Sequence, residues 1–404
     1  MFSRPLAVTG VRVFDGTSLV EHAAVLVDGP TITSVGIGVD PAGREVVDGV
    51  GATLLPGLID CHAHPTGDAL ALAMLFGVTT EIDMFTTPER LGDQRVRAEK
   101  RNDVADLRSA STGATVLGGH PSMLIGLSFR EQFPVVSSTA AAAQFVRDRI
   151  AEGADFIKLL IDDGEAMGHP SPSLTGEMAR VIVEEAHAHG LMAVAHATSV
   201  RNALEAVEAG VDGLVHVFMD QMPHEEVVAA IGEAGIFVIP TLVTMGSLAG
   251  ELTGSAVAED ARARRLIPDD WHGNLCRCWQ LGSPSSLANA MAATAALHEA
   301  GVPILAGTDA ADVGVFGTAH GVSLHQELGL LVDCGLTPAE ALAAATSVAA
   351  RTWRLPDRGR IAPGLQADLV LVDGDPTTDI RSSLSIRSVW RRGEELDRTL
   401  QDAV

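Results

Sequence analysis

From residue 54 onward, short apolar segments alternate with Ala- and Glu-rich segments, and this alternation most constrains the fold. It is typical of parallel α/β proteins, in which a helix follows each buried strand. Eight strands are predicted: 54–62, 77–84, 114–119, 154–160, 190–196, 212–216, 235–240 and 301–308. Eight such units within about 250–300 residues suit a (β/α)₈ barrel better than an open sheet. We therefore predict an α/β chain with a TIM-like (β/α)₈ barrel over residues 54–358.

The two ends of the chain show a different pattern. Residues 6–14, 23–27 and 32–35 are short alternating segments separated by turn residues, which indicates an antiparallel β unit. The segment 366–373 near the other end resembles them, and a helix is predicted before it, over 328–352. We expect a small β-sandwich domain formed by two separate segments, 1–53 and 359–404.

Charge and hydropathy exclude several classes of partner. The formal net charge of −24 would repel nucleic acid, and no apolar run reaches the length of a membrane span. No secretory signal is visible after Met1, so we expect a cytoplasmic protein. We further expect its partner to be a small-molecule substrate, and we expect the chain to form a homo-oligomer. The scattered cysteines predict no disulfide framework, and Cys276-x-Cys278 lacks the second pair that a structural zinc site needs.

The segment 246–285 is longer than a usual connection between a strand and a helix. It contains Trp271, Trp279 and a charged stretch over 259–265. Two interpretations remain open, a lid over the substrate site and a surface excursion without a role in binding.

Polar side chains end several of the predicted strands. In an extended strand every second side chain points to the same face, so His62 and His64 can bind one metal ion together. Four further strand ends carry Lys158, His196, His216 and Asp309. Each has an ordinary explanation, such as a hydrogen-bonded core histidine or, for Asp309, a helix N-cap. Because the carboxyl ends of barrel strands meet on one face, their coincidence indicates a metal centre.

Lysine usage singles out Lys158. Of the 28 basic residues, 28 − 2 = 26 are arginines, and the two lysines are Lys100 and Lys158. Lys100 lies in a charged stretch, whereas Lys158 lies in an apolar strand, where burial would favour the neutral amine. A neutral amine can add carbon dioxide, and the resulting carbamate has two anionic oxygens that can bridge two metal ions. The alternative is an uncarboxylated Lys158 paired with a nearby carboxylate.

These motifs resemble those of the amidohydrolase superfamily, most of all its prolidase-like and imidazolonepropionase-like members. The resemblance rests on Pro56-Gly57-Leu-Ile-Asp60-x-His62-x-His64, on the later ligands and on the closing segment 359–370. It implies two divalent metal ions, most simply zinc, with manganese, iron or cobalt as alternatives. His62, His64 and Asp309 would hold one ion, His196 and His216 the other, and carboxylated Lys158 would bridge them.

The resemblance also implies a reaction, hydrolysis of an amide-type C–N bond by metal-activated hydroxide. Asp309 would take the proton and pass it to the leaving nitrogen, and His120 would contact the substrate carbonyl or carboxylate, unless it is an ordinary loop imidazole. N-acyl amino acids, dipeptide-like compounds and aryl amides are the expected substrates. Relatives often carry an aromatic hydroxyl after the fifth-strand histidine, but here Thr198 and Ser199 follow His196 and the chain has no tyrosine. This difference weighs against a free amino-acid carboxylate as product.

Three alternatives remain. Lactone, ester or phosphotriester hydrolysis could use the same two-metal site. Deamination fits less well, because the deaminase branch lacks the lysine and carries His-x-x-Glu where this chain has Ser199. A catalytically silent metal-binding assembly protein would typically have lost ligands.

Loop side chains that could contact an apolar substrate, or equally belong to the core, are Met123, Phe129, Met219, Phe316 and Trp271.

Overall fold

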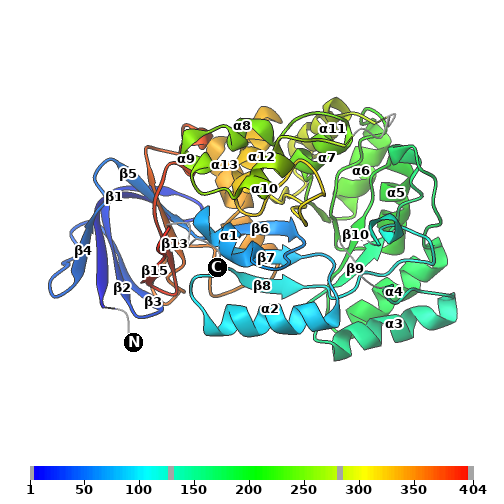
Figure 1. The fold of residues 1–404 in the computed structure, drawn as a ribbon, viewed down its shortest axis with the longest axis horizontal. Helices are drawn as coiled ribbons and strands as arrows, with labels where there is room; N and C mark the ends of the chain where they lie inside the picture. The colour runs from blue at the N-terminus through cyan, green and yellow to red at the C-terminus, as the bar shows by residue number, and fades with distance from the viewer. Residues whose placement is uncertain (1–3, 126–131, 280–284, 399–404) are drawn as a thin grey trace.

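Strands from both ends of the chain form one eight-stranded sheet (Figure 1). The computed structural model describes residues 4–125, 132–279 and 285–398. The sheet contains β1 (Leu6–Phe14), β2 (Leu19–Asp28), β3 (Thr31–Gly36), β4 (Glu45–Asp48), β5 (Ala52–Pro56), β13 (Leu369–Asp373), β14 (Ile386–Arg391) and β15 (Glu394–Glu395). β5 pairs antiparallel with β13, so strands from the two ends of the chain lie side by side. β4 and β5 run parallel to β1, so the unit is mixed, and the pairing does not confirm a sandwich of two sheets.

The middle of the chain contains two parallel sheets. One consists of β6 (Leu58–Ala63), β7 (Val78–Asp83) and β8 (Asp106–Ser109), and the other of β9 (Ile157–Leu160), β10 (Ala193–His196), β11 (Gly213–Leu214) and β12 (Phe237–Val238). Backbone contacts connect the two sheets on both sides. Ala114 bridges to Leu159 of β9, Ile304 bridges to Val238 of β12, and the N–H of Cys61 in β6 donates to Ala306 at 2.9 Å. The predicted parallel α/β arrangement is thus confirmed.

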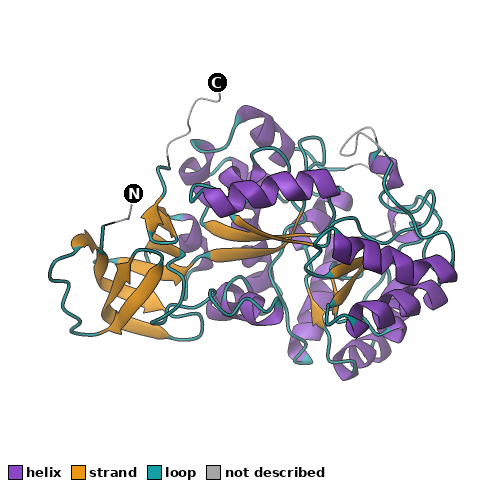
Figure 2. Cartoon of the chain, turned by 90° about the horizontal axis from the view of Figure 1, so that it is seen from below, coloured by secondary structure: helices purple, strands orange, loops and turns teal. Residues whose placement is uncertain are grey.

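Helices lie between and around these strands (Figure 2). They are α1 (Ala69–Leu75), α2 (Pro88–Lys100), α3 (Thr139–Ala151), α4 (Gly176–Ala188), α5 (Val200–Ala209), α6 (Glu225–Glu233), α7 (Leu242–Leu248), α8 (Ser255–Ala258), α9 (Ala261–Arg264), α10 (Asp269–Leu275), α11 (Leu287–Glu299), α12 (Val322–Asp333), α13 (Pro338–Ala344) and α14 (Ser347–Thr352). Several begin at a Ser or Thr whose side chain accepts a backbone N–H, among them Thr87, Ser138 and Ser199. None of the described helices combines the length and apolar character needed to cross a bilayer.

Three predicted elements differ from the structure. The third strand is β8, not 114–119, where only Ala114 forms a bridge and Leu117 is 76% exposed. Residues 301–308 contribute a single bridge rather than a full strand. The single helix over 328–352 is wrong, because Gly335 has a φ of +103° that ends α12, and a capping box of Thr337 and Glu340 starts α13.

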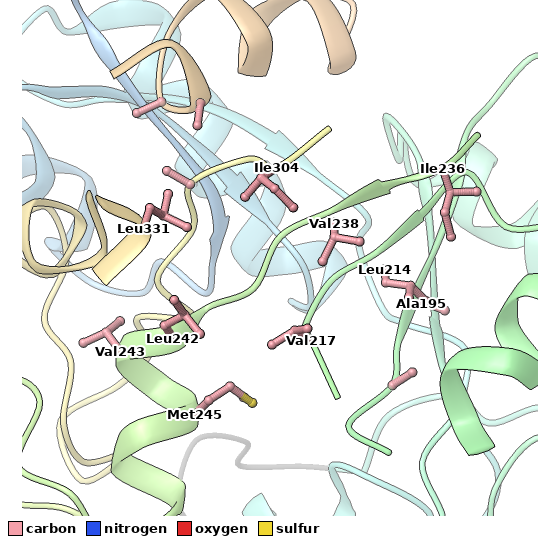
Figure 3. Packing of buried hydrophobic residues seen from close by; sticks show 14 of the residues in the cluster. Ala195, Leu214, Val217, Ile236, Val238, Leu242, Val243, Met245, Ile304 and Leu331 are labelled. Atoms are coloured by element: carbon pink, nitrogen blue, oxygen red, sulfur yellow. The ribbon is translucent and has the colours of Figure 1, made fainter. Parts of the chain in front are cut away.

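Buried aliphatic side chains hold the second parallel sheet against α7 and α12. In Figure 3, Leu331 of α12 lies beside Leu242 of α7, while Val238 of β12 lies between them and Leu214 of β11. All four side chains are almost completely buried. This packing fixes the start of α7, which follows the carboxyl end of β12. The polar residues gather at the carboxyl ends of these strands.

Candidate functional site

His62 and His64 meet a carboxylate at the carboxyl end of β6. The pairing of β6 with β7 shifts register between Asp60 and Ala63, so the strand is irregular where the two histidines lie. The Nε2 atoms of His62 and His64 lie 3.2 and 3.0 Å from the same oxygen, Oδ1 of Asp309. The structure therefore brings the first strand and the last predicted strand together at one point.

A buried carboxylate beneath them holds both backbones in place. Asp60 accepts hydrogen bonds from the N–H of His62 at 3.1 Å, from the N–H of Thr308 at 3.0 Å and from the Thr308 hydroxyl at 2.6 Å. Asp309 has a φ of +59°, an uncommon conformation for a residue with a side chain, and its N–H donates to the carbonyl of His62 at 2.7 Å. Asp60 thus positions the two side chains that would bind a metal ion.

His196 and His216 extend the cluster across the neighbouring strands. The His216 ring centroid lies 4.6 Å from that of His62 and 4.4 Å from that of His196. Nδ1 of His216 is hydrogen-bonded to Oγ1 of Thr241 at 2.7 Å. All four strand-end histidines named from the sequence are therefore gathered in one place.

A second group of donors, which sequence reasoning missed in part, surrounds His196. Its Nε2 lies 2.6 Å from Oδ2 of Asp162, and the His120 ring stacks on it at 4.4 Å. Thr198 donates to the same Asp162 oxygen at 3.3 Å. Burial alone would raise the pKa of Asp162, but the contact with His196 holds it well below its usual range. Asp162 follows the apolar strand β9, so the strand-end rule that identified Lys158 could also have identified it.

Lys158 is buried, as predicted, with 2% of the residue exposed. Burial lowers the pKa of its ammonium to about 7, although the charges of Asp309 and Asp83 oppose this shift. A substantial fraction of the side chain is therefore the neutral amine near neutral pH, which is the form that can add carbon dioxide.

These side chains line a cavity of about 560 Å³. All six ligands named from the sequence contribute to it, together with His120, Met123 and Asp162. Most of the remaining lining is apolar, and it includes Met84, Phe85, Leu124, Leu160, Met167, Met245, Leu248, Trp279 and Val315. A volume of this size suits a drug-sized organic molecule.

Three of the side chains expected to contact substrate lie elsewhere. Met219 is fully buried in the core, Trp271 packs edge-on against His320 at 5.5 Å, and Phe316 packs against Trp279 at 5.2 Å. None of the three lines the cavity, so these expectations are corrected. Phe129 lies outside the described residues. The segment 246–285 contributes Trp279 to the lining, while its helices α8–α10 pack on a separate apolar cluster.

The donors fit a metal ion. Both ring nitrogens of His62 are buried; Nδ1 has no hydrogen-bond partner among the described residues, and Nε2 has only the 3.2 Å contact with Asp309, an arrangement that is costly without a ligand. Burial and the neighbouring Lys158 charge lower the pKa of His62 to about 3, so the ring is neutral and can donate a lone pair. Two groups, His62 with His216 and Asp309, and His120 with Asp162 and His196, each place their donor atoms within 4.8 Å of one another. Imidazole and carboxylate donors suit zinc and similar divalent ions.

Comparison with known proteins identifies the family of this chain. Residues 53–396 match the Amidohydrolase family. The chain is 25% identical to 5-methylthioadenosine/S-adenosylhomocysteine deaminase of Halobacterium salinarum (99% of this chain, 92% of that protein) and 27% identical to imidazolonepropionase of Anaeromyxobacter sp. (87% and 84%). A solved Xaa-Pro dipeptidase with bound methionine has a similar fold, with a TM-score of 0.78 and 22% identity over 97% of this chain and 100% of that one. This chain therefore belongs to the amidohydrolase family and is a hydrolase that acts on C–N bonds.

Proposed function

We propose that this enzyme hydrolyses an amide-type C–N bond of a small, largely apolar molecule at a centre of two divalent metal ions. The observation that carries the proposal is the convergence of His62, His64, Lys158, His196, His216 and Asp309 on one mainly apolar cavity. His62, His64 and Asp309 would hold one zinc ion, and His196 and His216 the other. A carbamate on Lys158 would bridge them, in keeping with its burial and lowered pKa. When bound, such ions acidify water and polarise a carbonyl group.

Asp309 is the residue we assign to proton transfer. Its side chain is 19% exposed and lies beside both His62 and His64, so it can reach a water molecule in the cavity. Its pKa lies well below the ordinary value, because the neighbouring histidines outweigh the effect of burial. The carboxylate is therefore available to accept a proton from water and to deliver it to the leaving nitrogen.

His120 is the residue we assign to the substrate carbonyl. It lines the cavity and stacks on His196, with the two ring centroids 4.4 Å apart. Burial and the charge of His196 lower its pKa to about 3, so it acts as a neutral imidazole that donates a hydrogen bond through its N–H. Such a donor would stabilise the negative charge that develops on a carbonyl oxygen.

The barrel and the domain division belong to the same proposal. Backbone contacts at Ala114 and Ile304 support a single closed (β/α)₈ barrel over 54–358. The pairing of β5 with β13 supports a separate small β domain made of 1–53 and 359–404.

Deamination is the second candidate, since the Halobacterium relative carries that name. Three observations favour amide hydrolysis. Lys158 is present in the cavity, and among the described residues no glutamate lines it. Ser199, three residues after His196, accepts the N–H of Asn202 as the N-cap of α5 rather than facing substrate.

A substrate panel with metal analysis tests the proposal. The panel contains N-acyl amino acids, dipeptides, cyclic amides, aryl amides, lactones and an aminopurine nucleoside, assayed before and after chelation of metal. We expect at least two equivalents of metal per chain and chelator-sensitive release of amine from an apolar amide. Release of ammonia from the nucleoside alone, or of acid from lactones alone, would overturn the amide assignment.

A further inference from the structure

A second group of metal-binding side chains lies away from the cavity, at the junction of α8, α9 and α10. His272 lies in α10, Cys276 caps its carboxyl end, and Glu259 caps the end of α8. Each residue offers one ligand atom, and these three atoms lie within 4.8 Å of one another at this junction. None of the three residues lines the cavity described above. We propose that Glu259, His272 and Cys276 form a zinc-type metal site.

The separations of the three donor atoms match those around a tetrahedral ion. Oε1 of Glu259 lies 3.1 Å from Nε2 of His272, and Sγ of Cys276 lies 3.9 Å from each of them. Zinc binds sulfur at about 2.3 Å and nitrogen or oxygen at about 2.0–2.2 Å, so tetrahedral ligand atoms lie about 3.4–3.6 Å apart. Each observed separation differs from that spacing by only about 0.3 Å.

The local fold pre-orders these side chains. His272 and Cys276 are four residues apart, which places them on the same face of a helix, one turn from each other. Val257 and Ala258 of α8 and Leu275 of α10 belong to one buried apolar cluster, so Glu259 is held beside α10. The cationic neighbour Arg264 is bound to Asp269 at 2.8 Å. Three protein ligands would leave a fourth position for water.

The site gives Cys276 a partner that sequence spacing did not reveal. Cys278 is its nearest cysteine in the chain but belongs to no group of three or more donors within 4.8 Å of one another among the described residues. His272 and Glu259 supply the ligands instead. A bound metal ion would connect the carboxyl end of α10 to the end of α8. Its ligand Cys276 lies three residues before Trp279, which lines the cavity.

Titration of the metal-stripped full chain with Co²⁺ tests the site. A Co²⁺–thiolate bond produces a near-ultraviolet charge-transfer band, whereas the candidate active site has only nitrogen and oxygen donors. We expect a band whose final intensity corresponds to one Co²⁺–thiolate bond per chain, reached once the cavity sites are also filled. It should disappear in Cys276→Ser, require about tenfold or more Co²⁺ in His272→Ala, and remain in the matched control Cys278→Ser. Absence of the band, or its persistence in Cys276→Ser, would overturn the proposal.

A measurement on the unmodified chain covers the case in which a variant fails to fold. Zn²⁺ should slow alkylation of Cys276 at least tenfold, as followed by mass spectrometry of the digested protein. Alkylation of Cys278 in the same sample should change little. Equal rates for Cys276 with and without Zn²⁺ would contradict the site.

Discussion

Nδ1 of His216 lies 2.7 Å from Oγ1 of Thr241, and that hydroxyl donates its own proton to the carbonyl of Pro240 at 2.8 Å. The Thr241 oxygen must therefore accept a proton from Nδ1 of His216. The ring is held as the Nδ1–H tautomer, which leaves Nε2 with a free lone pair for a metal ion.

Thr241→Val should weaken metal binding while changing the shape of the side chain little. Valine has the shape of threonine but no acceptor, so the His216 ring loses the contact that fixes its tautomer and orientation. We expect metal affinity to fall by about 10–100-fold, measured by competition with a chromophoric chelator. Thr294→Val removes a buried hydroxyl that bonds to Ala290 within α11, and it serves as the matched control. Equal affinities in the two variants would contradict the assigned role of Thr241.

Lys158→Ala should remove nearly all activity and make it recoverable by small acids. Loss of the bridging group costs several kcal/mol of transition-state stabilisation, about 10³-fold in rate. Acetate or propionate should restore part of the rate, because a free carboxylate can occupy the space of the carbamate. Lys158→Arg fills that space and should show no rescue. Full activity of Lys158→Ala, or failure of acids to rescue it while metal still binds, would contradict a carboxylated lysine.

Asp309→Asn should separate catalysis from metal binding. The amide oxygen can still bind metal, but it cannot shuttle a proton, so kcat should fall by about 10²–10⁴-fold while most of the metal is retained. Asp212→Asn alters a carboxylate at the start of the strands, where Asp212 accepts the N–H of Ala193, and should leave kcat near the wild-type value. Undiminished turnover in Asp309→Asn would remove this residue from the mechanism.

Glu327 predicts a pH dependence of stability that is separate from the cavity. Its carboxylate accepts the N–H groups of Leu242 and Val243, each at 2.9 Å. Burial raises its pKa from 4.5 to about 8, although these two donors lower it. Because the folded-state pKa lies above the unfolded one, the stabilisation is fully present below about pH 4.5 and is lost as pH rises through 8.

Glu327→Gln has no proton to lose and should not show this decline. Urea denaturation between about pH 5 and 9 should show the unfolding free energy of the wild type falling relative to the variant as pH rises. All other titrating groups are shared, so the difference isolates Glu327. Parallel curves would show that its pKa is not raised.

The parallel α/β arrangement was predictable because buried strands and helices leave different periodicities in the sequence. The gathering of polar side chains in the cavity was predictable for a related reason, since histidine, aspartate and lysine are unusual at the ends of apolar strands such as β6 and β10. Lys158 was distinguished further by the near absence of lysine elsewhere.

Other features depend on contacts that sequence order does not reveal. Leu117 belongs to an apolar segment, yet it is exposed and forms no strand, and β8 is the strand that pairs with β7. Met219 and Met123 were equivalent in the sequence, but the first packs in the core and the second lines the cavity. Tertiary packing brings Asp162 to His196. It also brings Glu259 to His272 of α10 and to Cys276 at the end of that helix.

The most direct test of the central claim is a zinc titration of the metal-free enzyme, followed by hydrolysis of the best amide from the panel. Performed in Cys276→Ser, the titration excludes the thiol at the α8–α10 junction from the count. We predict no hydrolysis without metal and a rise to maximal activity at two equivalents of Zn²⁺ per chain. Full activity of the metal-free protein, or saturation at one equivalent, would contradict a two-metal hydrolase.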